Sequence, residues 1–239
     1  MNLAVAARRA TEAALSAGAT DAEAWAEEST SRQVRVYAGE VESLSDAGAR
    51  GVGVRAFVGA RSGYAYGTDL GDGGVAEVAQ AARQAAEVAD EDEHAGLPDQ
   101  SGTTAVPDLA SAELAAWSTG RKVELALAIE RAARAREGVT QVENAVYSDA
   151  EGSVALANSR GFTAGYSATQ AWAYASAFAG EGAELMTGLG VGLGRDPQLA
   201  AAELLRPAGP RHPRARRRRG AADAGHPHPG PFSLVHRRG

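Results

Sequence analysis

Histidine is the residue type in this sequence best suited to metal chemistry, and four of the five histidines lie near the C-terminal end, at positions 212, 226, 228 and 236. His226 and His228 lie two residues apart, but no helix or carboxylate cluster accompanies them, so nothing fixes a metal-binding geometry and at most adventitious metal affinity is expected. The fifth histidine, His94, is followed by an alanine, and no His-Glu-x-x-His sequence occurs in the chain. The sequence therefore predicts no metal-ligating residue.

Three short segments approach known motifs for catalysis or cofactor binding. Thr119-Gly-Arg-Lys122 resembles Ser-x-x-Lys but lacks a partner Lys-Thr-Gly, and Gly165-Tyr-Ser-Ala-Thr169 lacks the last glycine of a nucleophile elbow. Gly51-Val-Gly-Val-Arg-Ala56 fits a dinucleotide fingerprint, yet it lies within a strand pattern and opens no helix. We therefore predict no catalytic residue and no cofactor-binding residue in this chain.

The periodicity of apolar residues predicts the elements of the first half. Residues 2–17 are alanine-rich with helical spacing, and Gly18 stands where a C-terminal cap glycine belongs. Alternating residues between 23 and 68 predict short strands joined by glycine turns, as an antiparallel meander. Helical spacing returns over residues 74–90.

The second half repeats this order of helix and strands. A helix is predicted from Asp108 or Ser111 to about Arg136, and a β-rich stretch over residues 139–195. Gly188-Leu-Gly-Val-Gly-Leu-Gly194 alternates glycine with apolar residues, which predicts a strand whose bare face is closely packed. Asp196-Pro197 then predicts a helix start.

These patterns predict an α+β protein of two domains, each with an antiparallel sheet and long helices, followed by a disordered basic tail. The predicted divisions are residues 1–95 for the first domain, 96–110 for a Gly- and Pro-containing linker, 111–205 for the second domain and 206–239 for the tail. This prediction is incompatible with a single doubly wound parallel sheet.

Charge is divided unevenly along the chain. Residues 206–239 hold nine arginines and one acid, a net charge of +8, whereas the remainder has 15 basic and 29 acidic residues, a net charge of −14. An acidic body repels nucleic acid, so no specific nucleic-acid binding is expected. Cysteine is absent, no apolar run reaches membrane-spanning length, and the N-terminus lacks a secretory pattern, so we expect a cytoplasmic protein without membrane contact.

Several segments in order resemble the TldD/PmbA (TldE) metallopeptidase family over about residues 5–204. In the first domain these are Arg35-Val-Tyr-Ala-Gly-Glu-Val-Glu-Ser-Leu44, Gly51-Val-Gly-Val-Arg55 and Arg61-Ser-Gly-Tyr-Ala65. In the second they are Lys122-x-x-x-Ala126-x-x-x-Glu130 and Ala157-Asn-Ser-Arg-Gly161, and these two lean towards the PmbA side.

The resemblance implies a subunit of a cytosolic metallopeptidase that acts on unfolded or leader peptides, as a homo-oligomer or as a hetero-oligomer with a TldD-type subunit. In that family zinc is bound in the third, C-terminal domain of the TldD subunit, on a His-Glu-x-x-x-His helix absent from this sequence. We therefore expect no cofactor in this chain, although zinc is implied for the family's catalytic subunit. The alternatives are a non-catalytic peptide-binding or scaffold partner subunit, and a broken gene product without function.

The tail prompts a separate prediction. Beyond about residue 205 neither periodicity continues, and arginine, proline, histidine, glycine and alanine dominate. Out-of-frame translation of GC-rich DNA favours this composition, so we predict a frame-shifted tail and a truncated subunit, with a genuine disordered basic tail as the alternative.

Overall fold

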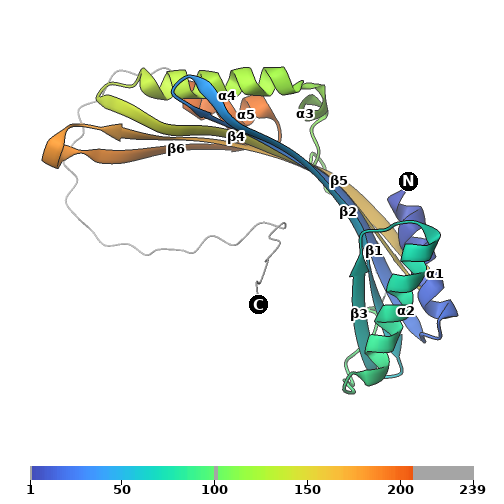
Figure 1. The fold of residues 1–239 in the computed structure, drawn as a ribbon. Helices are drawn as coiled ribbons and strands as arrows, with labels where there is room; N and C mark the ends of the chain where they lie inside the picture. Colours follow the sequence, from blue (N-terminus) through green and yellow to red (C-terminus); the bar gives the residue numbers. More distant parts are fainter. Residues whose placement is uncertain (1, 100–101, 207–239) are drawn as a thin grey trace. The chain divides into compact units, whose positions relative to one another are not determined.

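The computed structural model describes residues 2–99 and 102–206 (Figure 1). Its helices are α1 (Leu3–Ser16), α2 (Asp72–Val88), α3 (Ala112–Ala116), α4 (Thr119–Arg134) and α5 (Pro197–Leu205), with a short 3-10 turn, η1 (Gly182–Glu184). Its strands are β1 (Asp21–Tyr37), β2 (Glu40–Val58), β3 (Arg61–Gly67), β4 (Val139–Asn158), β5 (Thr163–Ala179) and β6 (Met186–Gly194). The predictions for the tail, including its frame shift and its four histidines, concern residues 207–239, which lie outside the described part of the chain.

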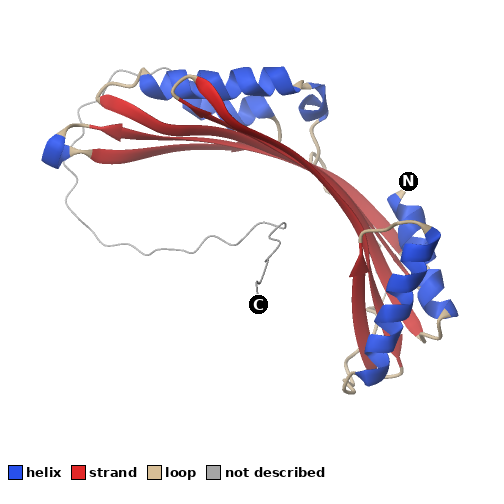
Figure 2. Ribbon diagram, viewed as in Figure 1, coloured by secondary structure: helices blue, strands red, loops and turns tan. Residues whose placement is uncertain are grey.

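The strands form one sheet in the order β3-β2-β1-β4-β5-β6, and every neighbouring pair is antiparallel. The predicted α+β class with antiparallel strands and long helices is confirmed (Figure 2). The strands are longer than the short strands predicted, since β1 has 17 residues and β4 has 20. At about 3.3 Å per residue, β1 extends for about 56 Å. The polar centres of these strands lack alternation of apolar residues, which is why periodicity alone finds only their ends.

Pairing between β1 and β4 joins strands from the two predicted domains, with Val34 opposite Tyr147 and Ala24 opposite Ala157. One sheet therefore runs through both halves of the chain, and the described residues form a single unit. The division at residues 96–110 stays a prediction about folding units.

Capping side chains and a left-handed glycine terminate the helices. The Asn2 carboxamide accepts from the Ala4 N–H at 2.9 Å, and Gly18 adopts the predicted left-handed conformation, with a φ of +102°. The predicted start of α5 is confirmed, because Asp196 Oδ1 accepts from the Leu199 N–H at 2.9 Å. The long helix predicted from residue 108 or 111 is interrupted, since Trp117 ends α3 and Ser118 caps α4.

Two apolar cores lie against the sheet. The first joins α1 and α2 to the start of β1, the end of β2 and the end of β4, and it is built largely of alanine and valine. The second lies under α4 and α5 and includes Val34 and Val36, which the sequence places in the first predicted domain. The β1–β2 hairpin is therefore a shared component that passes from one core to the other. No helix among the described residues is long and apolar enough to cross a membrane.

Candidate functional site

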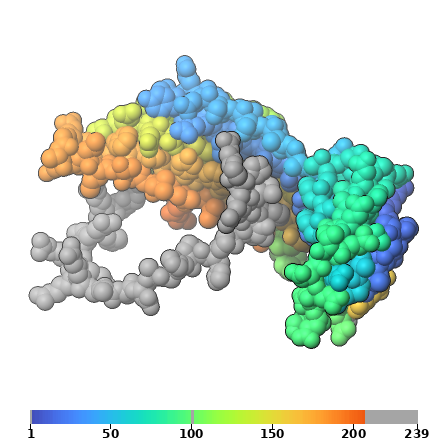
Figure 3. Space-filling model, turned by 60° about the horizontal axis from the view of Figure 1, so that its bottom comes forward, coloured from blue at the N-terminus to red at the C-terminus, as the bar shows by residue number. Residues whose placement is uncertain are grey.

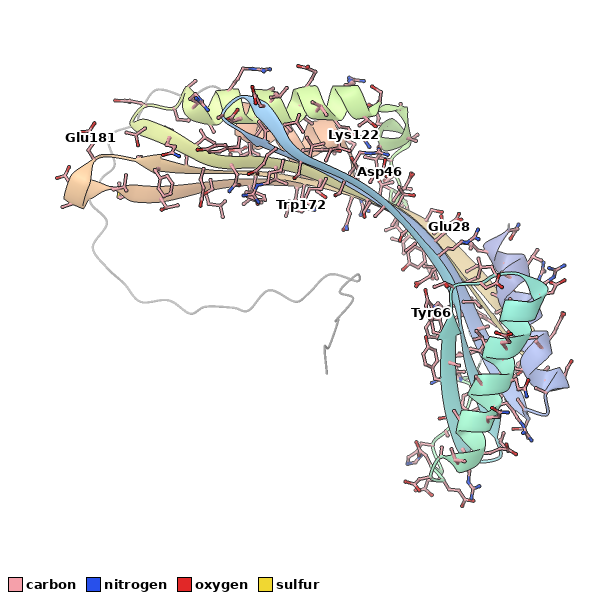
Figure 4. The ribbon with its side chains drawn as sticks, in the orientation of Figure 1. Glu28, Asp46, Tyr66, Lys122, Trp172 and Glu181 are labelled. Atoms are coloured by element: carbon pink, nitrogen blue, oxygen red, sulfur yellow. The ribbon has the colours of Figure 1, made fainter. Side chains whose placement is uncertain are left out.

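The side chains of β1 that face the helices change character along the strand. Ala22, Ala24 and Ala26 are buried in the first core, and Val34 and Val36 are buried in the second. Between them, on the same face because they share the same parity, lie Glu28, Thr30 and Arg32. Covering this polar segment with a helix would bury its polar groups, which costs free energy. Accordingly, α1 and α2 lie on one side of the segment and α4 and α5 on the other (Figures 2 and 4).

Neighbouring strands continue this polar segment into a band across the sheet. In register with Thr30 are Gly48 on β2 and Glu151 on β4, and Glu28 is opposite Arg50 and Ser153. A cavity of about 850 Å³ opens over this band, and we call it the waist trough. Its lining residues come from four strands and from the start of α3 with the two residues before it: Glu28, Ser29, Thr30, Gly48, Ala49, Arg50, Ala110, Ser111, Ala112, Glu151, Gly152, Ser153, Ser167, Ala168 and Thr169.

One wall of the trough is held by Thr169 of β5. The Ser111 N–H donates to Thr169 Oγ1 at 2.8 Å, and the Thr169 N–H donates to the Leu109 carbonyl at 2.9 Å. The Thr169 hydroxyl donates in turn to the Arg195 carbonyl at 2.8 Å. The pairing of β5 with β6 begins only at Ala171, so the Leu109 carbonyl, in a bend before α3, accepts the N–H that a further strand would otherwise pair with at this point. The end of the predicted linker is thus a wall of the trough.

A second cavity of about 320 Å³ adjoins the trough and shares Thr30 and Glu151 with it. The ion pair between Lys122 Nζ and Asp149 Oδ2, 2.8 Å apart, lies at this cavity. The two side chains are only 3% and 7% exposed. Lys122 is the chain's single lysine, and its burial on the inner face of α4 fastens that helix to β4.

Electrostatic effects around this cavity involve three further groups. Burial, and after it the nearby carboxylate of Asp149, raises the pKa of the Tyr147 hydroxyl, which therefore stays protonated. A hydrogen bond to Asp46 raises the pKa of Arg32, so the guanidinium at the cavity is permanently charged. Within the described residues the buried indole N–H of Trp117, which also lines the cavity, has no hydrogen-bond acceptor.

The described residues do not fit a zinc centre. No group of three or more His, Cys, Asp or Glu side chains gathers within residues 2–99 and 102–206 in a way that could hold a metal ion. Asp149, the most buried carboxylate at the cavities, is already neutralised by Lys122. His94, the one histidine in this range, is exposed and lies 3.7 Å from Glu93. The arrangement can bind polar groups by hydrogen bonds, and no hydrolytic step is derived from it.

The motif-like segments have structural places. Lys122 lies in the buried pair and Thr119 in the first turn of α4, while Ser167 and Thr169 lie on the trough. The Tyr66 hydroxyl lies over Gly51 in the middle of β2, where an added Cβ would overlap it, so Gly51 leaves room for a ring. The trough itself was not predicted. The one sequence signal for it is the polar interval between Ala26 and Val34 at alternate positions of β1.

The opposite face of the sheet carries aromatic side chains, and no helix of residues 2–99 and 102–206 covers them. Trp25 stacks on Tyr64 with ring centroids 5.4 Å apart, and Trp172 stacks on Tyr174 at 5.6 Å. The Tyr66 hydroxyl donates to Glu27 Oε1 at 3.4 Å on this face. Figure 4 labels Tyr66 and Trp172 at two separate places on the sheet. We call this surface the open face.

The comparisons with known proteins agree with this architecture. The model described as PmbA/TldA metallopeptidase domain 1 matches residues 22–89, and the model described as PmbA/TldA metallopeptidase central domain matches residues 112–208. No curated protein matches the chain in sequence.

Solved structures with the same fold include TldE from Thermococcus kodakarensis, at 18% identity and a TM-score of 0.74 over 82% of this chain and 45% of that chain. A proposed modulator of DNA gyrase from Bacteroides thetaiotaomicron is 20% identical, with a TM-score of 0.70 over 84% of this chain and 49% of that chain. A similar protein from Thermotoga maritima is 18% identical, with a TM-score of 0.66 over 83% and 46%. The chain thus spans just under half the length of these solved relatives. Because the two domain models together match well over half of the sequence, the chain belongs to the PmbA/TldD family of metallopeptidases.

Proposed function

We propose that this chain holds extended peptides in the waist trough as part of a PmbA/TldD-type peptidase. Hydrolysis would be performed at zinc by the C-terminal domain of a TldD-type subunit, which the chain contacts as an oligomeric partner. The substrates would be unfolded or leader peptides. The observation that carries the proposal is the trough, because it brings hydroxyl groups and bare backbone from four strands into one open cavity.

An extended peptide presents N–H and C=O groups regularly along its length, and the trough offers matching partners. Hydroxyls of Ser111, Thr30, Ser153 and Ser167 line it, and Gly48 leaves its own backbone uncovered. Four strands at a spacing of about 4.8 Å span about 14 Å, which accommodates about four extended residues. Contacts to backbone rather than to side chains suit substrates of varied sequence.

The charge of the trough predicts which peptide segments it binds better. Its lining contains two carboxylates, Glu28 and Glu151, and one guanidinium, Arg50, so two negative charges and one positive charge leave a net charge of −1. Neutral or basic peptide segments therefore suit it better than acidic ones. Added salt would weaken that preference, since these side chains are exposed.

The binding of Leu109 at the edge of β5 supports backbone capture at this place. There the Leu109 carbonyl, in a bend of the molecule's own chain, already accepts the Thr169 N–H. A substrate strand in the trough would add further main-chain hydrogen bonds next to it. Strand addition of this type obtains affinity from main-chain hydrogen bonds.

The experiment compares two glycine substitutions on opposite faces of the same sheet. Gly48 shares the helix-bearing face with Thr30, whereas Gly152, whose backbone also lines the trough, is opposite Ser29 and would direct an added side chain to the open face. A Cβ at either position would meet only ordinary contacts, at 3.8 Å for Gly48 and 3.6 Å for Gly152, so a side chain can leave the backbone at both positions, and circular dichroism checks that both variants fold. Gly48→Leu should weaken the binding of a fluorescein-labelled unstructured peptide, measured by anisotropy, and Gly152→Leu should not. Equal affinity for both variants, or no binding by the parent chain, would refute the trough as the peptide site.

Three further statements belong to this proposal. The absence of cysteine supports a cytoplasmic location. The Lys122/Glu130 helix and the Asn158–Gly161 turn support the PmbA side of the family.

The purified chain with added zinc should cleave none of the peptides that it binds. Stoichiometric zinc binding together with cleavage would contradict this, whereas sequencing the genomic DNA beyond codon 205 in all frames would test the frame-shifted tail.

A further inference from the structure

The alternating glycines of β6 are explained by the helix that covers one of its faces. A Cβ at Gly190 would lie 2.7 Å from Leu204 Cδ2, and one at Gly192 would overlap the carbonyl oxygen of Ala200. Both neighbours belong to α5, so α5 packs directly on the backbone of β6, as the sequence predicts for a bare strand face. The intervening apolar residues are left pointing away from α5.

These apolar residues form an exposed row. Leu189, Val191 and Leu193 are 67%, 49% and 74% exposed. They belong to the open face, since Val191 is opposite Tyr174 and Leu193 is opposite Trp172. In Figure 3 the orange atoms of this region lie at the surface. Neither a helix core nor the waist trough, which is on the other face, gives these side chains a role.

The outer edge of β6 is also unprotected. Within the described part of the chain, β6 pairs only with β5, so its second edge carries free backbone donors and acceptors. Soluble proteins usually guard such edges with lysine, other charges or proline. Residues Met186–Gly194 contain no charged residue and no proline. An apolar, uncharged edge is expected to pair with another strand.

The sequence of this edge identifies its partner. Residues 188–194 read Gly-Leu-Gly-Val-Gly-Leu-Gly, which is the same in both directions about Val191. When two copies pair antiparallel about a two-fold axis at Val191, each valine lies opposite the other valine. Each Leu189 then lies opposite a Leu193, and every glycine lies opposite a glycine. We propose that β6 is a homodimer interface, in which two copies of this chain join their sheets edge to edge with Val191 on the two-fold axis.

The proposed pairing accounts for both the unpaired backbone edge of β6 and its exposed row of apolar side chains. A two-fold axis perpendicular to the sheet keeps corresponding faces on the same side, so both α5 helices stay on one face and both apolar rows meet on the other. The row from each copy then continues into Trp172 and Tyr174 of its own β5. A register shifted by one residue would place leucine or valine opposite glycine, and a shift of the axis to Gly190 or Gly192 would place a leucine opposite Thr187 or Arg195, so each loses contact between apolar side chains. The self-complementary sequence therefore selects one register in a strand whose glycines would otherwise allow slippage.

Disulfide crosslinking can test the register, because the chain contains no cysteine. Directly opposite residues in an antiparallel pair have Cβ atoms about 4.5–5.5 Å apart, which is near disulfide range. Val191→Cys should form a crosslinked dimer on mild oxidation. Leu189→Cys alone should not, but a mixture of Leu189→Cys and Leu193→Cys chains should give the mixed dimer. Leu185→Cys, at an exposed site before β6, controls for random collision.

Sedimentation velocity of the full chain tests the assembly itself. The parent chain should sediment as a dimer, and Val191→Lys should shift it to monomer, since two ammonium groups would meet on the axis. Leu185→Lys, an equally exposed apolar-to-lysine change outside the strand, should leave the dimer intact. A parent chain that is monomeric at all concentrations, or Val191→Cys that crosslinks no faster than Leu185→Cys, would overturn the proposal. Efficient crosslinking of Leu189→Cys with itself would equally overturn this register. Peptide binding in the trough is measured separately and does not depend on these results.

Discussion

Lys122 Nζ lies 2.8 Å from Asp149 Oδ2 beneath the first turns of α4, and both side chains are more than nine-tenths buried. A buried ion pair of this kind gains little over an apolar pair, but removing one partner leaves an uncompensated charge. The pair thus fixes where α4 sits on β4, and with it the wall of the cavity beside the waist trough.

Removing the ammonium group should therefore be costly. Lys122→Met should lower the free energy of unfolding by about 3–5 kcal/mol, whereas the double variant Lys122→Met/Asp149→Leu should recover most of this loss. Urea denaturation measures both. Arg9→Met breaks an exposed pair with Asp72 and should cost no more than about 1 kcal/mol. A single variant as stable as the parent chain would show that Asp149 is solvated.

Glu130 holds the tip of the β1–β2 hairpin. Its carboxylate is 1% exposed and accepts from the Gly39 N–H at 2.8 Å, where Ala38 and Gly39 both have positive φ. Glu130→Ala should cost about 1–3 kcal/mol, since the Gly39 N–H loses its acceptor, and Glu130→Gln should cost less because an amide oxygen remains. Glu124→Ala, at an exposed position on the same helix, is the control in the same urea titration. Equal losses for the Ala and Gln variants would contradict this role.

The turn after β4 depends on Gly161, whose φ is +86°. Asn158 Oδ1 accepts from the N–H groups of Arg160 and Phe162, both at 3.0 Å, which closes the turn. Gly161→Val should lower stability by about 1–3 kcal/mol, and Gly161→Asn should cost less because asparagine tolerates this region. Gly102→Val, at a glycine without positive φ, controls for added bulk. Unchanged stability of Gly161→Val in a denaturant melt would refute the strain argument.

Asp21 should make stability depend on pH in the acid range. Hydrogen bonds from Ser159 at 2.6 Å and Arg160 at 2.9 Å lower the pKa of Asp21 below its ordinary value of 3.8. A lowered folded-state pKa gives stability that is present above the ordinary pKa and is lost as the pH falls through the folded value. Asp21→Asn should therefore flatten the dependence of urea stability on pH below about 4. An unchanged pH profile in this variant would assign the acid sensitivity to other carboxylates.

Local patterns were sufficient for some of these features. Gly18 and the Asp196-Pro197 start each depend on neighbours in the sequence, and the structure confirms both. The pairing of β1 with β4 could not be predicted, because its partners are more than a hundred residues apart and their central side chains are polar. The trough depends on that pairing, since Thr30 and Glu151 meet only when the strands are in register. Lys122 lies within a predicted helical pattern, but its burial requires Asp149 from another element.

Photo-crosslinking of a bound peptide tests the central claim most directly. An unstructured peptide that carries a benzophenone side chain is bound to the parent chain, irradiated and mapped by mass spectrometry. The trough predicts adducts within residues 28–30, 48–50, 110–112 and 151–153, with loss of these adducts in Gly48→Leu and retention in Gly152→Leu. Adducts concentrated on the open face around Trp25 or Trp172 would contradict the account.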